Sequence, residues 1–155
     1  MASYDRKFEV IQPTLDRLSR KTLEVDDLQL LNPTYSLALI PGELVQLSSV
    51  YKFKRATDAA VPSFFSIEDR GDYGPQAARK LSAIMGGSFE ADTIVFSTAL
   101  TSVGAAVQMG TVNNALSGSV NRAGLVASSG GIILGYVTKV ASNNGGLIRV
   151  LQTFV

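Results

Sequence analysis

The side chains that could perform acid–base or metal chemistry are few, and the densest group is a short run of carboxylates. Glu68, Asp69 and Asp72 lie close together in the sequence. Paired carboxylates can act as general acid and base in glycoside hydrolysis, or they can bind a hard cation such as Ca²⁺. Here they flank Arg70 among turn-forming glycines, which is typical of a solvated loop tip. We therefore predict no catalytic residue and no metal site in this segment.

Two other short patterns suggest binding chemistry but lack the context that would support it. Arg70-Gly71-Asp72 matches an integrin-binding tripeptide, but three residues recur by chance and nothing marks the chain as an extracellular animal protein. Glycine pairs such as Gly130-Gly131 suggest a phosphate-binding loop, yet neither Gly-x-x-x-x-Gly-Lys-Ser/Thr nor Gly-x-Gly-x-x-Gly occurs. Gly130-Gly131 also precedes a predicted strand, not a helix whose N-terminus could hold phosphate. We interpret these patterns as turns.

A basic run beside aromatic residues is the remaining candidate for chemistry. Lys52, Lys54 and Arg55 alternate with Tyr51 and Phe53, and basic residues interleaved with aromatics can bind nucleic acid. Alternation in a strand, however, places Tyr51 and Phe53 on one face and the lysines on the other, as in any half-buried strand. We therefore predict a strand here and no nucleic-acid partner.

The residue types that the chain lacks narrow the possible functions further. There is no Cys and no His, so the chain has no disulfide, no thiolate nucleophile and no imidazole base or metal ligand. Catalysis would depend on carboxylates, Lys, Tyr, Ser and Thr, for example at Glu68, Asp69, Asp72 or Lys139. Because no convergent polar set is visible, we expect a non-enzymatic protein without a cofactor. An enzyme or a small-ligand barrel remains the alternative.

Length and composition indicate one domain with a core of its own. The chain has 155 residues, 46% of them hydrophobic, and a formal net charge of +1, so no global charge attracts nucleic acid or anionic lipid. The N-terminus is polar, and no run approaches the roughly 18 apolar residues of a membrane helix. We expect a protein made in the cytoplasm with no membrane partner.

The elements that would position these residues are mostly short strands separated by turns. From residue 36 to 155 we predict an antiparallel β-barrel or sandwich, with the last two strands forming a hairpin around residues 143–146. Pro41-Gly42 predicts a type II turn. The expected strands cover Ser36–Ile40, Glu43–Leu47, Val50–Arg55, Val61–Ile67, Phe89–Ser97, Ala106–Gly110, Gly124–Ala127, Ile132–Val140 and Leu147–Val155, while Gln76–Met85 could be a helical turn or a strand.

Residues 1–35 differ from the remainder in being dense in charge. The apolar spacing of Leu15, Leu18, Thr22 and Val25 is helical, but the apolar face is narrow. We interpret residues 1–35 as an N-terminal arm, extended or partly helical, that becomes ordered on a partner. A helix packed against the β domain is the open alternative.

The C-terminal half is almost free of charge. From Thr93 to Val155 there is no acidic residue, and only Arg122, Lys139 and Arg149 are basic. Exposed surfaces normally carry mixed charges, whereas protein interfaces are depleted of Lys, Glu and Asp. We therefore predict that much of this half faces other protein, although an uncharged barrel surface is the alternative.

Several segments in this order resemble the decoration, or cement, proteins of tailed bacteriophage capsids. The residues that carry the resemblance are 39–47 (LIPGELVQL), 103–109 (VGAAVQM), 131–140 (GIILGYVTKV) and the final strand 147–151 (LIRVL). The N-terminal arm and residues 61–85 depart from the family pattern because they are longer than in a minimal member.

The resemblance implies a β-tulip-like fold and a purely structural role. Such a protein forms a homotrimer on the outer surface of an expanded capsid, binds the major capsid protein, and bridges capsomers in the virion after synthesis in the host bacterium. It uses neither a cofactor nor a metal. Another virion component, a tail-tube or head–tail joining protein, is the alternative. We expect the arm to supply the capsid-binding residues, namely Tyr4, Arg6, Lys7, Phe8, Arg17, Arg20 and Lys21.

Overall fold

The computed structural model describes residues 8–13, 17–32, 34–67 and 80–153, and in this part of the chain it is almost entirely β structure. Short 3-10 helices interrupt the strands, among them η3 (Leu28–Leu31), η5 (Ala115–Ser117) and η6 (Ala141–Asn143). The strands are β1 (Phe8–Gln12), β2 (Ser19–Glu24), β3 (Leu44–Leu47), β4 (Phe53–Arg55), β5 (Phe64–Ser66), β6 (Lys80–Gly86), β7 (Phe89–Thr93), β8 (Ala106–Val112), β9 (Arg122–Ala127), β10 (Gly135–Lys139) and β11 (Ile148–Gln152).

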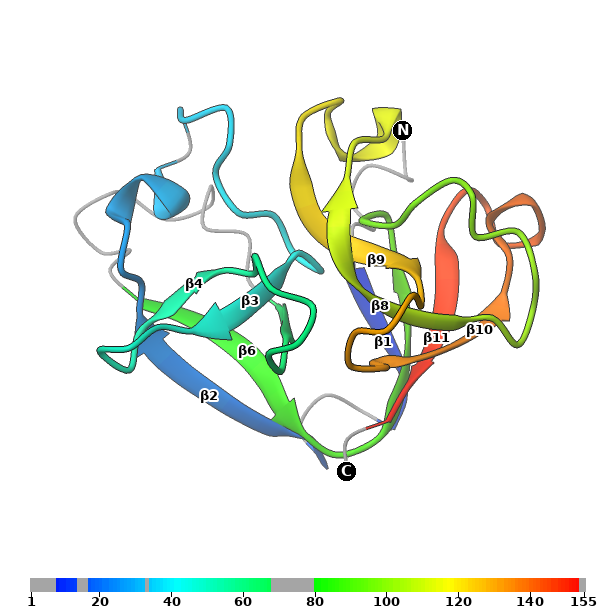
Figure 1. Cartoon of the computed structure of the whole chain (residues 1–155), viewed down its shortest axis with the longest axis horizontal. Coiled ribbons are helices and arrows are strands. Elements are labelled where there is room, and N and C mark those ends of the chain that lie inside the picture. Colours follow the sequence, from blue (N-terminus) through cyan, green and yellow to red (C-terminus); the bar gives the residue numbers. More distant parts are fainter. Residues whose placement is uncertain (1–7, 14–16, 33, 68–79, 154–155) are drawn as a thin grey trace.

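The strands form two antiparallel sheets. Sheet A has the order β1-β7-β11-β10-β8-β9, and sheet B has the order β2-β6-β5-β3-β4. Figure 1 shows them side by side, with β2, β3, β4 and β6 in one sheet and β1, β8, β9, β10 and β11 in the other. The predicted mainly antiparallel β fold is confirmed, and its arrangement is that of a sandwich. The predicted terminal hairpin is present as the β10–β11 pair.

The main hydrophobic core joins the two sheets. Its side chains alternate along the strands, because successive residues of a strand point to opposite faces. In β11, for example, Ile148 and Val150 are buried, while Leu151 points outward. The core combines residues of sheet B with residues of sheet A, including Leu44, Phe65, Ile84, Phe89, Val107, Leu125, Ile148 and Val150.

Sheet B is buried on its second face as well. Residues 25–39 cross that face, and Leu30, Leu31 and Leu39 pack there against Val45 and Phe53. The η3 turn in this covering segment begins at Asp27, whose side chain accepts a hydrogen bond from the Gln29 N–H at 3.0 Å. Coverage on both sides explains why Leu44 and Val45, neighbours in β3, are both completely buried.

The described part of the expected arm supplies two strands of the sheets, followed by the 3-10 helix η3 in the segment that covers sheet B. β1 pairs with β7 at one edge of sheet A, and β2 pairs with β6 at one edge of sheet B. In residues 19–24 the helical spacing gives a strand and not a helix, because pairing with β6 overrides that local preference. The Phe8 ring stacks on Phe65, with centroids 5.3 Å apart. Deleting residues 8–24 would therefore remove an edge strand from each sheet.

Two other local predictions differ from the structure. Ser36–Ile40 forms no strand and instead belongs to the segment that covers sheet B. Tyr51 and Phe53 do not share a face, because β4 begins only at Phe53. Tyr51 lies in the preceding turn with φ 59° and is exposed, whereas Phe53 is completely buried.

The predicted turn at Pro41-Gly42 is present, and it fits tightly against sheet A. The Glu43 N–H donates to the Ile40 carbonyl at 3.1 Å, and Gly42 has φ +88°, as the third position of a type II turn requires. A Cβ atom at Gly42 would lie 2.7 Å from Thr93 Oγ1 and 3.0 Å from Phe8 Cδ1. The glycine is thus required both by its backbone conformation and by the closeness of sheet A.

We expect Gly42→Ala to destabilise the fold by more than the roughly 1–2 kcal/mol of a left-handed alanine, because the methyl group also displaces Thr93 and Phe8. Gly104→Ala is the matched control, since Gly104 has φ +89° and a Cβ atom there would meet no other atom within 4 Å. Urea unfolding of both variants measures the difference. Equal losses of stability would show that the contact with sheet A contributes nothing.

A buried ionic cluster connects the two sheets beside this turn. Glu43 is completely buried; its carboxylate accepts from Arg55 Nε at 2.5 Å and from Arg122 Nη1 at 3.0 Å. Arg55 belongs to sheet B, and Arg122 begins β9 in sheet A. Arg122 also donates to the carbonyls of Ala38 at 2.8 Å and Ser117 at 2.6 Å. The cluster therefore ties sheet A to sheet B and to the segment that covers it.

We expect Glu43→Gln to cost about 3–5 kcal/mol of unfolding free energy, because Arg122 would remain buried without a charged partner. Glu90→Gln is the control: it has the same chemistry at a half-buried site, where the carboxylate accepts from the Thr138 hydroxyl at 2.9 Å. Chemical denaturation of both variants provides the measurement. A Glu43→Gln variant as stable as Glu90→Gln would contradict the role assigned to the cluster.

Candidate functional site

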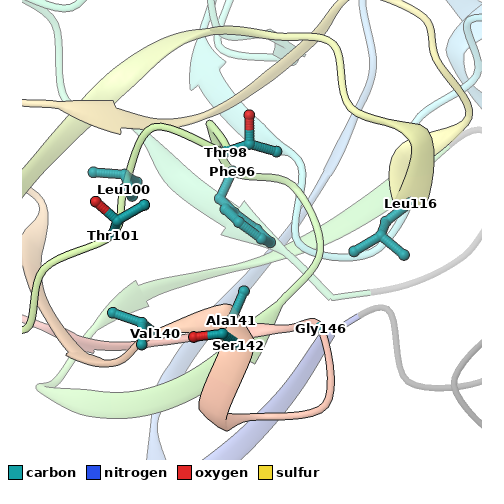
Figure 2. Close-up of a pocket in the computed structure, with 9 residues that line it drawn as sticks. All are labelled: Phe96, Thr98, Leu100, Thr101, Leu116, Val140, Ala141, Ser142 and Gly146. Carbon is teal, nitrogen blue, oxygen red and sulfur yellow. The ribbon is translucent and has the colours of Figure 1, made fainter.

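A largely apolar hollow of about 520 Å³ lies among the loops of sheet A. Figure 2 shows that three segments surround it: the loop of residues 96–101, the η5 turn and the η6 turn. Phe96, Leu116 and Ala141 converge on this space in that view. Leu116 is half exposed, so its side chain forms part of an accessible rim.

The buried Asn114 side chain fixes the geometry of this hollow. Its amide nitrogen donates to the carbonyls of Ile94 at 2.9 Å and Phe96 at 2.7 Å, and its amide oxygen caps η5 by accepting from the Ser117 N–H at 2.8 Å. One side chain thereby holds the loop that carries Phe96 against the turn that carries Leu116. The hollow is thus built into the fold, and it suits an apolar side chain.

The lining of the hollow offers hydroxyl groups but no acid or base. Its polar side chains are Thr98, Thr101 and Ser142, and the other lining residues are apolar. A hydroxyl can donate or accept a hydrogen bond, but without a neighbouring base it is a weak nucleophile. The hollow therefore offers apolar contact surface and three hydroxyl groups for hydrogen bonds.

Two of the three charged residues of the C-terminal half form ion pairs with carboxylates of the chain. Arg122 is buried in the Glu43 cluster, and Arg149 forms a two-pronged pair with buried Asp92, at 2.8 and 3.2 Å. The hydrogen bond to Asp92 raises the pKa of Arg149 above its ordinary value, despite partial desolvation. Lys139 is the remaining charged residue after Thr93, and it is exposed. The described surface of this half is accordingly even less charged than its sequence suggests.

A short apolar row lies on the outer face of sheet A across β8, β10 and β11, and it ends at Glu90 of β7, which lies opposite Leu151. Tyr136 in β10 lies opposite Leu151 in β11 on one side and opposite Ala106 in β8 on the other. Tyr136 and Leu151 are 41% and 38% exposed, respectively, so an apolar pair is presented where a free surface would normally carry polar groups. Sequence reasoning does not select these residues, although the alternation Gly135-Tyr136-Val137 already directs Tyr136 away from the core.

The structure describes four of the seven residues predicted to contact a capsid. Arg17 is exposed, and Arg20 and Lys21 are exposed on β2. Phe8 is half-buried in β1 and packs against the hydrophobic core. This packing explains why an aromatic residue is present there without a contact to another protein. The remaining members of the set, Tyr4, Arg6 and Lys7, lie outside the described residues, and the contact role of the whole set stays a prediction.

Other candidate features of the sequence also fall outside the described residues or form no cluster. The carboxylates Glu68, Asp69 and Asp72 and the Arg70-Gly71-Asp72 tripeptide lie in the part of the chain that is not described. In the described ranges, no three acidic side chains are grouped so that they could hold a metal ion. None of the helices described there has the length and apolar character needed to cross a membrane.

Comparison with known proteins adds no relative. No protein-family model, no curated protein and no solved structure gives a significant match to this chain. The assignment of a function therefore depends on the surfaces described above.

Proposed function

We propose that this chain is a structural virion protein that binds the outer surface of an expanded phage capsid and stabilises it by bridging capsomers as a trimer. The observation that carries the proposal is the charge-poor surface of the C-terminal half. Arg122 and Arg149 are paired with carboxylates of the chain, so Lys139 is the unpaired, exposed charge of residues 93–153. Depletion of charge is characteristic of the centre of a protein interface.

The apolar row supports a contact between subunits. Tyr136 is of a residue type enriched in interface hot spots, and Leu151 extends its apolar surface to the next strand. A row of this kind on a rigid sheet is a poor site for catalysis but a good surface for association. In the proposed trimer, sheet A supplies the contacts between subunits.

The charged part of the molecule supports a separate contact with the assembly. Arg17, Arg20 and Lys21 are exposed, and β2 lies in sheet B, the sheet opposite the apolar row. In the proposal, this charged region binds the major capsid protein. Weak contacts repeated on a symmetric lattice give strong overall binding through avidity, without any deep pocket.

We expect the purified chain to have the mass of three chains by light scattering, and the double variant Tyr136→Glu/Leu151→Glu to have the mass of one. Two carboxylates in the row would have to lose their water in the subunit contact, which is costly for unpaired charges. Leu28→Glu is the control, because Leu28 is likewise exposed but belongs to η3 over sheet B.

Co-sedimentation with expanded heads of the phage that encodes the chain tests the second half of the proposal. Wild-type protein should sediment with the heads and raise the temperature at which they rupture. Failure to bind such heads would overturn the proposal. A large ring or tube in solution would favour a tail-tube or head–tail joining protein instead.

A further inference from the structure

β2 is an edge strand with little cover. Five of its six residues are exposed, and β6 is its neighbour in sheet B. Within the described part of the chain, the backbone of residues 19–23 is hydrogen-bonded only to β6. An edge strand with this much exposed backbone can accept a further strand.

A cleft of about 510 Å³ lies beside the end of this strand. It is lined by the last three residues of β2, the first residue of β6 and the turn before β4. Its lining residues are Thr22, Leu23, Glu24, Val50, Tyr51, Lys52 and Lys80. The parallel bridge between Val25 and Phe53, reinforced by a 3.0 Å hydrogen bond from the Asp26 N–H to the Phe53 carbonyl, closes one end.

The turn that forms the outer wall presents two apolar side chains to solvent. Val50 and Tyr51 are 65% and 56% exposed, respectively. Tyr51 has φ 59°, and its N–H donates to the Ser48 carbonyl at 3.1 Å, while the Lys52 N–H donates to Ser48 Oγ at 3.2 Å. A non-glycine residue held at positive φ marks a local strain that the surrounding hydrogen bonds maintain. The turn thus holds an aromatic contact beside an open strand edge.

The charges around this edge are predominantly positive. Lys52 and Lys80 line the cleft, and Arg20 and Lys21 stand on β2 itself. Glu24 is the acidic residue in the lining. An occupant that carries carboxylates would therefore find complementary charge at Arg20, Lys21 and Lys52. Lys80 lies opposite Glu24 in the β2–β6 register.

We propose that the free edge of β2 accepts an extended, carboxylate-bearing segment of a partner protein, which adds to sheet B as a further strand beside Tyr51. Its backbone pairs with β2, its acidic side chains pair with Lys52 and Lys80, and Tyr51 contacts its apolar side chains. The inference deepens the proposed function, on which it rests, by locating the contact with the assembly. Protein is favoured over nucleic acid because an open strand edge matches another backbone.

A titration with a synthetic peptide of alternating valine and glutamate, followed by amide NMR, tests this site directly. We expect shifts and slowed hydrogen exchange for residues 19–23, and no binding by the counterpart peptide with lysine in place of glutamate. Lys52→Glu/Lys80→Glu should weaken binding by at least about ten-fold, because it replaces attraction with like-charge repulsion. Lys139→Glu, a charge reversal on sheet A, should leave it unchanged.

The outcomes separate this inference from the proposed function. Three results would each overturn the β2 site. The first is amide shifts confined to the apolar hollow or the Tyr136 row, and the second is no binding at millimolar peptide. The third is tighter binding of oligothymidine at residues 19–23. If wild-type protein and the Lys52→Glu/Lys80→Glu variant bind expanded heads equally well, the β2 site is wrong and the proposed function stands. If wild-type protein binds acidic peptide at β2 but not heads, the proposed function fails instead.

Discussion

The carboxylate of Glu43 imposes the constraint on which the arrangement of the two sheets depends. It is completely buried and faces one arginine from each sheet. A buried charge is tolerated only where its partners are held in good geometry, so the sheets, the Pro41-Gly42 turn and the backbone at Ala123, whose N–H donates to Glu43 at 3.3 Å, must keep one relative position. Surfaces on opposite sides of the molecule are thereby held in a fixed relation.

The two sheets carry different surfaces on this common frame. Sheet A exposes a short apolar row and pairs Arg122 and Arg149 with carboxylates of the chain, whereas sheet B keeps exposed cations along β2 and beside the Tyr51 turn. A protein that joins copies of itself and also docks on a larger assembly needs two such surfaces with different chemistry. The division between the two surfaces follows the two sheets.

Patterns formed by near neighbours are predictable from the sequence, and pairings across long distances are not. The turn at Pro41-Gly42 and the β10–β11 hairpin are set by local residues, and both are confirmed. β2 escapes prediction as a strand, because its sequence, SRKTLE, has no apolar alternation and its conformation comes from pairing with β6. The role of Glu43 is equally hidden, since Arg122 is 79 positions away. The hollow around Phe96 likewise depends on three segments that meet only in the folded chain.

The hydrogen bond from Arg122 to the Ala38 carbonyl has a consequence for cooperativity. The segment that covers sheet B is fastened by a residue of sheet A, so it cannot fray without disturbing the buried cluster at Glu43. A segment held only by the sheet that it covers would detach at a low free-energy cost, as peripheral segments commonly do. Here the cover, sheet B and sheet A form a single cooperative unit, despite the two-lobed outline of the ribbon in Figure 1.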